Sequence, residues 1–166
     1  MKRITARTIE GFLEKLREDG LSEYATELKL IVAMSRKRKK AMDALSQMSI
    51  TLLVHSIKLI SMPQARDKNK WKKEIRGYLS HFNVWNQSPS HKPWLSLGYI
   101  QEELDDILSD PSFYRLVERE LETYTKTDRN KVLTLLKEKK SLKDFEIKFK
   151  YDSNNDLNMN IKNQPV

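Results

Sequence analysis

A long helix with apolar residues on most of its sides is the feature that most constrains the fold of this chain. The helix is predicted over residues 35–61, with Ser35 as its cap and Pro63 just beyond its end. One seam is spaced by alternating fours and threes: Ala41, Leu45, Met48, Leu52, His55, Leu59 and Met62. A second apolar row covers another face: Ile50, Leu53, Val54, Ile57 and Ile60. A helix with so little polar surface is expected at the centre of a bundle.

The rest of the helical periodicity places further helices around this centre. The chain has only four glycines and five prolines, which is typical of long helices. Helical spacing predicts helices over residues 9–19, 22–34, 66–84 and 94–108, then from Pro111 with Asp110 as cap, and from residue 127 or 128. Residues 86–93, rich in turn-forming residues and including His91, are predicted to form an irregular loop.

The period changes to two near the end of the chain, as expected for strands. Apolar residues alternate with polar ones at Phe145, Ile147, Phe149 and Tyr151, and again at Leu157, Met159 and Ile161. An isolated hairpin is barely stable in water, so residues 143–166 are expected to pack on the helices of residues 1–142 or on a partner. The predicted fold class is all-α, a multi-helix bundle with a central long helix and a short C-terminal β-hairpin.

Basic charge is abundant and clustered. The chain has 31 basic and 23 acidic residues, for a net charge of +8, which favours a polyanionic partner such as nucleic acid, or an acidic protein surface. Two groups of basic residues are candidate polyanion-binding sites: Arg36, Lys37, Arg38, Lys39 and Lys40, and on a later helix Lys68, Lys72 and Arg76 at spacings of four. The first group has a simpler explanation as the solvated start of a helix.

His55 lies on the apolar seam between Leu52 and Leu59 and has two interpretations. It could act as a general base with a carboxylate from another helix, in a hydrolase or nuclease. The simpler interpretation is a buried histidine hydrogen-bonded inside the bundle. Glu102, Glu103, Asp105, Asp106 and Asp110 form the densest acidic cluster, which is explained most simply as the solvated face of a helix.

Several classes of protein are excluded or disfavoured. The chain has no cysteine, so disulfides, thiolate catalysis and cysteine-based metal sites are excluded. We expect no metal, no cofactor and no catalytic residue, because metal-ligand spacings, phosphate-binding glycine loops and catalytic motifs are absent; the enzymatic interpretation is disfavoured and stays open. No run approaches the roughly 20 successive apolar residues that span a bilayer, and no secretory signal begins the sequence. A cytoplasmic protein with no membrane partner is therefore expected.

Three local motifs, in matching order and spacing, resemble those of one family. They are the runs Leu52-Leu53-Val54-His55-Ser56-Ile57-Lys58-Leu59, Trp71-Lys72-Lys73-Glu74-Ile75-Arg76 and Ser88-Pro89-Ser90-His91-Lys92-Pro93-Trp94-Leu95. Together they resemble the bacterial domain-of-unknown-function family twenty-nine, over roughly residues 9–108. The resemblance implies an almost wholly helical fold and brings no assigned activity or catalytic residues. The chain beyond residue 109 departs from the family's pattern.

These observations predict a non-enzymatic binding module whose basic surface engages nucleic acid or another polyanion. The alternative is a protein–protein adaptor or a subunit of a larger assembly, including a homo-oligomer. In that alternative the C-terminal hairpin and the charged helices would bind the partner.

Overall fold

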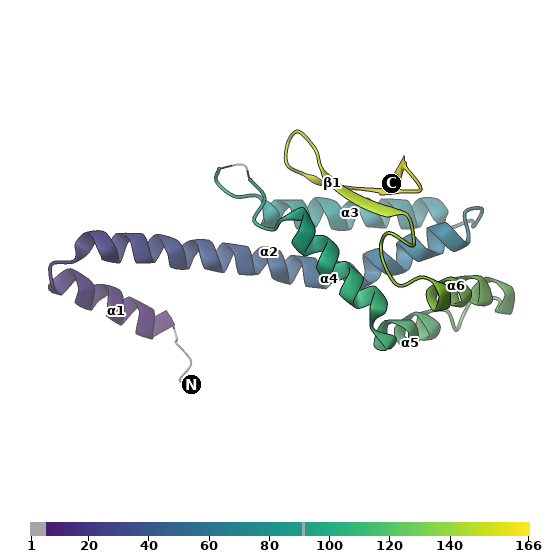
Figure 1. The fold of residues 1–166 in the computed structure, drawn as a ribbon, viewed down its shortest axis with the longest axis horizontal. Coiled ribbons are helices and arrows are strands. Elements are labelled where there is room, and N and C mark those ends of the chain that lie inside the picture. Colours follow the sequence, from purple (N-terminus) through teal and green to yellow (C-terminus); the bar gives the residue numbers. More distant parts are fainter. Residues whose placement is uncertain (1–5, 91) are drawn as a thin grey trace. The chain divides into compact units, whose positions relative to one another are not determined.

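The computed structural model describes residues 6–90 and 92–166, together with the side chains of residues 8–90 and 92–166 (Figure 1). Within these ranges the chain forms six helices and one small antiparallel sheet, which confirms the predicted all-α class with a short C-terminal hairpin. The helices are α1 (Ala6–Glu18), α2 (Ser22–Ser61), α3 (Lys68–Asn86), α4 (Leu97–Ser109), α5 (Pro111–Glu120) and α6 (Lys126–Glu138). The strands are β1 (Ile147–Tyr151), β2 (Leu157–Ile161) and β3 (Gln164–Pro165). His91 lies outside the described residues.

The chain divides into two compact units, residues 1–39 and residues 40–166, which meet inside α2. In the first unit, α1 forms a helical hairpin with the beginning of α2. The second unit contains the rest of α2, the other helices and the sheet, and nearly all of the buried apolar side chains. This division does not coincide with the boundary predicted between residues 142 and 143, because the sheet packs on helices of its own unit.

One continuous helix, α2, replaces the two helices predicted over residues 22–34 and 35–61. Ser35 was predicted to cap the second helix, but a cap requires a backbone that leaves the helical conformation, and no glycine or proline between Ser22 and Ser61 produces such a break. The predicted seam is buried apart from His55, whose side chain keeps a small exposed fraction. On the second apolar row Ile50 differs from the prediction, because it is exposed.

By length and composition alone α2 contains a stretch apolar enough to cross a membrane, although no run of 20 apolar residues exists. That stretch is 61% buried inside the structure, as is usual for the core helix of a helical bundle. Its apolar surface is therefore largely used in packing against α3, α4 and the sheet.

Side-chain caps decide where three of the later helices begin. Asp110 caps α5 as predicted, with Oδ1 accepting a hydrogen bond of 2.8 Å from the backbone N–H of Ser112. α4 begins three residues later than predicted because Ser96 caps it, and α6 begins just before its predicted start because Thr125 caps it. In both cases a hydroxyl oxygen accepts a hydrogen bond from the first helical turn.

The C-terminal sheet confirms the predicted hairpin and adds a third strand. β1 and β2 pair with Phe149 opposite Met159, and both side chains point into the core. β3 was not predicted; it pairs with the end of β2 through a two-residue turn at Lys162 and Asn163. Both turn residues have positive φ, 49° and 61°, as a type I′ hairpin turn requires. Glycine usually fills such a position, so Lys162-Asn163 gave little sign of a turn.

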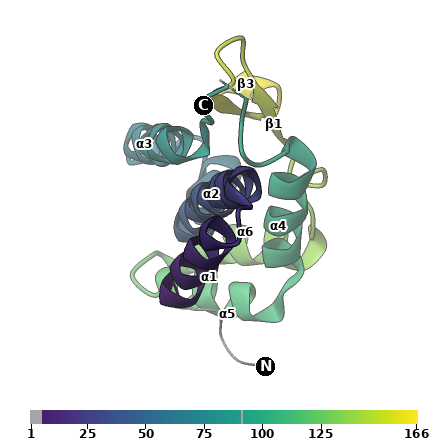
Figure 2. The ribbon, with the colours of Figure 1, turned by 90° about the vertical axis from the view of Figure 1, so that its left-hand side faces the viewer.

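Two asparagines of α3 attach the sheet to the helices. The side chain of Asn83 forms a reciprocal pair with the backbone of Leu157, accepting from its N–H (2.8 Å) and donating to its carbonyl (3.2 Å). Asn86 is buried and donates to Tyr151 Oη (2.7 Å), while the backbone N–H of Leu95 donates to its Oδ1 (2.9 Å). As a result β2 packs along α3 and β1 packs on α4 (Figure 2).

Replacing Asn83 by alanine should loosen the sheet, because the N–H and carbonyl of Leu157 lose their partners. We expect the free energy of unfolding in urea to fall by about 1–3 kcal/mol, the usual cost of leaving such groups unpaired. Asn69→Ala is the matched control, since Asn69 lies exposed on the same helix and should leave stability nearly unchanged. Equal stability of the two variants would contradict this role for Asn83.

Candidate polyanion-binding site

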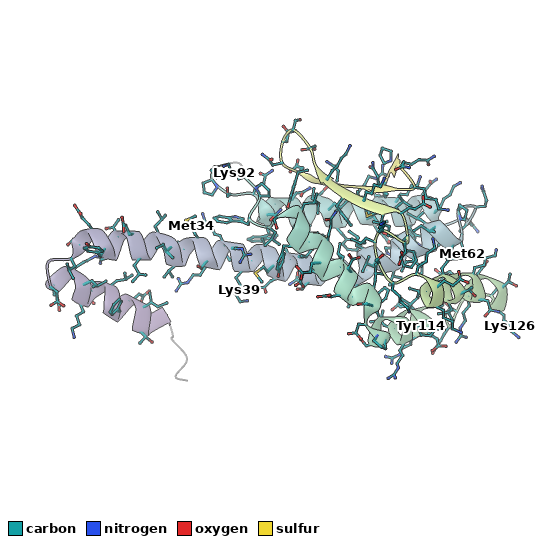
Figure 3. The ribbon with its side chains drawn as sticks, in the orientation of Figure 1. Met34, Lys39, Met62, Lys92, Tyr114 and Lys126 are labelled. Carbon is teal, nitrogen blue, oxygen red and sulfur yellow. The ribbon has the colours of Figure 1, made fainter. Side chains whose placement is uncertain are left out.

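The two predicted groups of basic residues lie in different parts of the structure. Arg36 to Lys39 belong to the first unit, and all four side chains are exposed on α2 (Figure 3 labels Lys39). Lys40 begins the second unit, where its Nζ lies 5.4 Å from the ring centroid of Trp85. Since successive helical residues are about 100° apart, this run presents positive charge on every side of the helix. The second group lies on α3.

Two of the α3 lysines meet a third lysine at one cavity. Lys68 and Lys72 line this cavity of about 320 Å³, together with Lys162 from the turn between β2 and β3. Its remaining walls come from the end of α2 and the last residues of the sheet: Leu59, Ile60, Pro63, Ile161, Gln164, Pro165 and Val166. None of these described lining residues has an acidic side chain. Arg76, the third predicted residue on α3, is exposed and does not line the cavity.

The attachment of β2 along α3 explains why Lys162 reaches the other two lysines. β2 starts at Leu157, beside Asn83 near the end of α3, and it reaches the cavity at Ile161. Five residues of strand from Leu157 to Lys162 span about 17 Å. Eleven residues of helix from Asn83 back to Lys72 span about the same distance. The strand therefore runs antiparallel to the helix, and its turn ends at the lysines of α3.

This arrangement suits an anion with several oxygen atoms. Each ammonium group is a compact charge with three hydrogen-bond donors, and three of them around one cavity can share the oxygens of a phosphate. The amino end of α3 begins at Lys68, and a helix amino terminus adds partial positive charge. Asp67 occupies the cap position without forming a side-chain hydrogen bond there. Apolar residues of α2 and of the sheet form most of the rest of the cavity wall.

Sequence reasoning missed Lys162, because the predicted second strand ended at Ile161 with nothing to return the chain. The sequence signal for Lys162 was its position directly after the alternating apolar and polar residues of the second strand. Lys162 adopts a positive φ, which is uncommon for a residue other than glycine or asparagine, so the tight turn sets the backbone position from which this side chain leaves.

His55 has the carboxylate partner that the sequence did not reveal. Its Nε2 lies 2.7 Å from Glu74 Oε2, and the ring of Tyr78 stacks on it with centroids 6.4 Å apart. Its Nδ1 is buried without a hydrogen-bond partner. A neutral ring protonated at Nε2 satisfies this geometry, because Nε2–H donates to Glu74 and no N–H donor is buried unpaired. The side chain of His55 is only 13% exposed, so the pair resembles the buried, hydrogen-bonded histidine of the simpler interpretation.

The surroundings of His55 oppose its protonation. Burial lowers the pKa of His55 below its ordinary value of 6.5, and this effect outweighs the opposing charge of Glu74. The positive charges of Lys58 and Lys70 lower the pKa further, and Glu120 raises it slightly. Lys58 is itself buried, with Nζ 5.0 Å from the ring centroid of Tyr124 and 5.9 Å from that of Trp71, where cation–π attraction stabilises its charge.

The acidic cluster on α4 serves mainly the fold. Asp105 Oδ1 accepts a hydrogen bond of 2.6 Å from the backbone N–H of Leu142, and Asp110 caps α5. Backbone and side-chain hydrogen bonds from Ser112 lower the pKa of Asp110. Glu102 and Asp106 are exposed. Within residues 6–90 and 92–166, no cluster of three or more histidine, aspartate or glutamate side chains could hold a metal ion.

Comparisons with known proteins give no relative. No protein-family model, no curated protein and no solved structure matches the chain. The resemblance to family twenty-nine therefore rests on the three motifs alone. Their apolar members lie in the core: Leu52, Leu53, Trp71, Ile75 and Leu95 are buried.

The burial of His55 beside Glu74 should make the free energy of unfolding depend on pH near neutrality. Because the pKa of His55 is lower in the folded chain than in the unfolded chain, the unfolded chain binds more protons as the pH falls below 6.5. The contribution to stability is therefore complete above that pH and decreases on acidification. We expect the urea midpoint of the native chain to fall as the pH is lowered through 6.5, and the midpoint of His55→Gln to fall less. His81→Gln, at an exposed histidine, should keep the native slope; a slope unchanged in His55→Gln would contradict the assignment.

Proposed function

We propose that this chain is a non-enzymatic module that binds the phosphates of nucleic acid through its basic surfaces. The observation that carries the proposal is the convergence of Lys68, Lys72 and Lys162 on one cavity with no acidic side chain in its described lining. Phosphate groups are the anions that several lysines on one surface bind best, and such contacts release counterions from the nucleic acid.

The remaining basic residues extend this interaction. Arg76 lies one turn beyond Lys72 on α3, and Arg36 to Lys40 form a second exposed group on α2. Contacts of this kind position a nucleic acid and carry little sequence information. The proposed module therefore binds with weak sequence preference, and the net charge of +8 speeds its association with nucleic acid.

Fluorescence anisotropy with short duplex DNA, single-stranded DNA and RNA across a salt series tests this function. Affinity should fall steeply with salt, and the triple variant Lys68→Ala/Lys72→Ala/Lys162→Ala should bind more weakly. On duplex DNA each lost phosphate contact reduces the slope of log K against log salt by about 0.9, so up to about 2.7 for three. A variant neutralised from Arg36 to Lys40 measures the second group separately.

The matched control removes the same charge elsewhere, by Lys15→Ala/Lys29→Ala/Lys150→Ala at three exposed lysines. Its slope should stay close to that of the native chain, which separates a local site from the effect of net charge. Absence of binding at low salt, or equal losses in the two triple variants, would refute the cavity as the binding site.

The second candidate function is a protein–protein adaptor or a subunit of an assembly. An exposed apolar surface on the first unit favours it: Phe12, Leu21, Tyr24, Leu30, Ile31 and Met34. The C-terminal hairpin fits this role less well, because Phe145, Phe149 and Met159 belong to the core. Removal of residues after 142 would therefore open the core, and a partner interface is better tested by substitutions at exposed residues.

A further inference from the structure

The helical hairpin of residues 6–39 buries very little of its own apolar surface. Among its described side chains, Leu13 and Ala25 are the buried apolar residues. An open cavity of about 470 Å³ remains between its helices, lined by Thr8, Ile9, Phe12, Leu28 and Val32. Two helices alone seldom form a stable core, and their free apolar faces commonly pack on further helices.

The exposed apolar residues of α2 form a continuous surface, here called the outer face. Tyr24, Leu30, Ile31 and Met34 are between 47% and 64% exposed. Ile31 follows Tyr24 by two helical turns, and Met34 follows Ile31 by three residues and Leu30 by four. At about 100° per residue the four side chains fall within an arc of about 120°. Leu28 and Val32 point to a different side, where they line the cavity against α1.

Charges at the two ends of the outer face have opposite signs. Glu23 and Glu27 fall within the same arc near the start of α2, and Lys37 and Arg38 fall within or beside it after Met34. All four side chains are exposed. Along the helix the surface therefore changes from acidic through apolar to basic. Two copies placed antiparallel would bring the acidic end of each against the basic end of the other.

We propose that the outer face of α2 is the interface between two copies of this chain, packed antiparallel about a two-fold axis near residues 30 and 31. In this pairing Leu30 lies opposite Ile31 of the second copy, and Glu23 lies opposite Arg38 of the second copy. The apolar residues fill the centre, and opposite charges meet at both ends. A parallel pairing would place acidic residues against acidic residues and basic against basic, and such juxtaposition is destabilising.

The cavity at Lys68 belongs to the other unit, whereas Lys37 and Arg38 belong both to this interface and to the proposed nucleic-acid surface. Arg36, Lys39 and Lys40 lie on other sides of α2 than Lys37 and Arg38. The oligomeric state is therefore measured without nucleic acid, so that failure of the dimer and failure of nucleic-acid binding are separate results.

Light scattering coupled to gel filtration of the full chain measures the oligomeric state. We expect twice the mass of one chain for the native protein and the mass of one chain for Ile31→Glu. Because Ile31 is exposed, circular dichroism should show unchanged helix content in this variant. Val84→Glu is the matched control, since Val84 is an apolar residue on α3 that is more exposed than Ile31, and this variant should remain a dimer.

A monomeric native chain would overturn the proposal and leave the outer face for a different partner. A dimer unaffected by Ile31→Glu would also overturn it, because the contact would then lie elsewhere.

Charge exchange tests the antiparallel orientation. Glu23→Lys/Glu27→Lys should weaken the dimer, and so should Lys37→Glu/Arg38→Glu. The variant with all four substitutions restores complementary ends, so its dimer should recover towards the native affinity. Failure of the combined variant to recover would refute the pairing.

Spin labels give the orientation directly, because the chain has no cysteine of its own. A label on Ser35→Cys should lie about 14 Å along the axis from its copy, and one on Ser22→Cys about 26 Å, from the rise of 1.5 Å per residue. A parallel pair would give the same short separation at both sites, which would contradict the proposal.

Discussion

The hydrogen bonds that Asn83 and Asn86 make to the last third of the chain hold the second unit together. Asn86 is buried, and a buried carboxamide is tolerated only where its polar atoms find partners. Here they form a closed set, because Asn86 donates to Tyr151 Oη, Tyr151 donates to the Leu95 carbonyl (2.7 Å), and the Leu95 N–H donates back to Asn86. Burial raises the pKa of Tyr151, so its phenol stays protonated and keeps donating. The network attaches β1 at Tyr151, and Asn83 attaches β2 to α3.

The basic cavity follows from that alignment. Lys68 and Lys72 belong to α3 by sequence, but Lys162 reaches them only because β2 runs back along the helix and the chain turns there. Polar side chains of α2 also find their partners on other segments. Glu74 of α3 accepts a hydrogen bond from the N–H of His55, and the rings of Trp71 and Tyr124 lie beside Lys58. These polar groups fix which faces of α2 and α3 meet, since any slip would leave them buried without partners.

The two surfaces with proposed partners differ in chemistry and in position along the chain. The cavity is cationic and lies in the unit with a large core, whereas the outer face of α2 lies in the unit that lacks one. A dimer formed through the outer face would carry two lysine cavities. Two weak phosphate sites on one particle bind a long polyanion more tightly than either alone, provided that both reach it at once. Association of the chain would in this way strengthen the proposed binding of nucleic acid.

The sequence by itself determined the helical fold, the buried seam of α2, the cap at Asp110 and the C-terminal hairpin. Each of these depends on periodicity or on a local side-chain-to-backbone hydrogen bond, which neighbouring residues decide. It misplaced a helix boundary at Ser35, because a serine that can cap a helix is also accepted inside one when no break in the backbone occurs there. It also grouped Lys68, Lys72 and Arg76 through their spacing on one helix face, and two of the three line the cavity.

The partner of His55, the third lysine of the cavity and the third strand were decided only by the tertiary structure. Glu74 became the partner of His55, Lys162 joined the cavity, and β3 formed on a turn without glycine. The first two outcomes depend on residues 19 to more than 90 positions apart, and the packing of the core selects them; β3 depends on a turn whose two residues both adopt positive φ. Periodicity in a sequence reports which face of an element is buried; it does not report which other element covers that face.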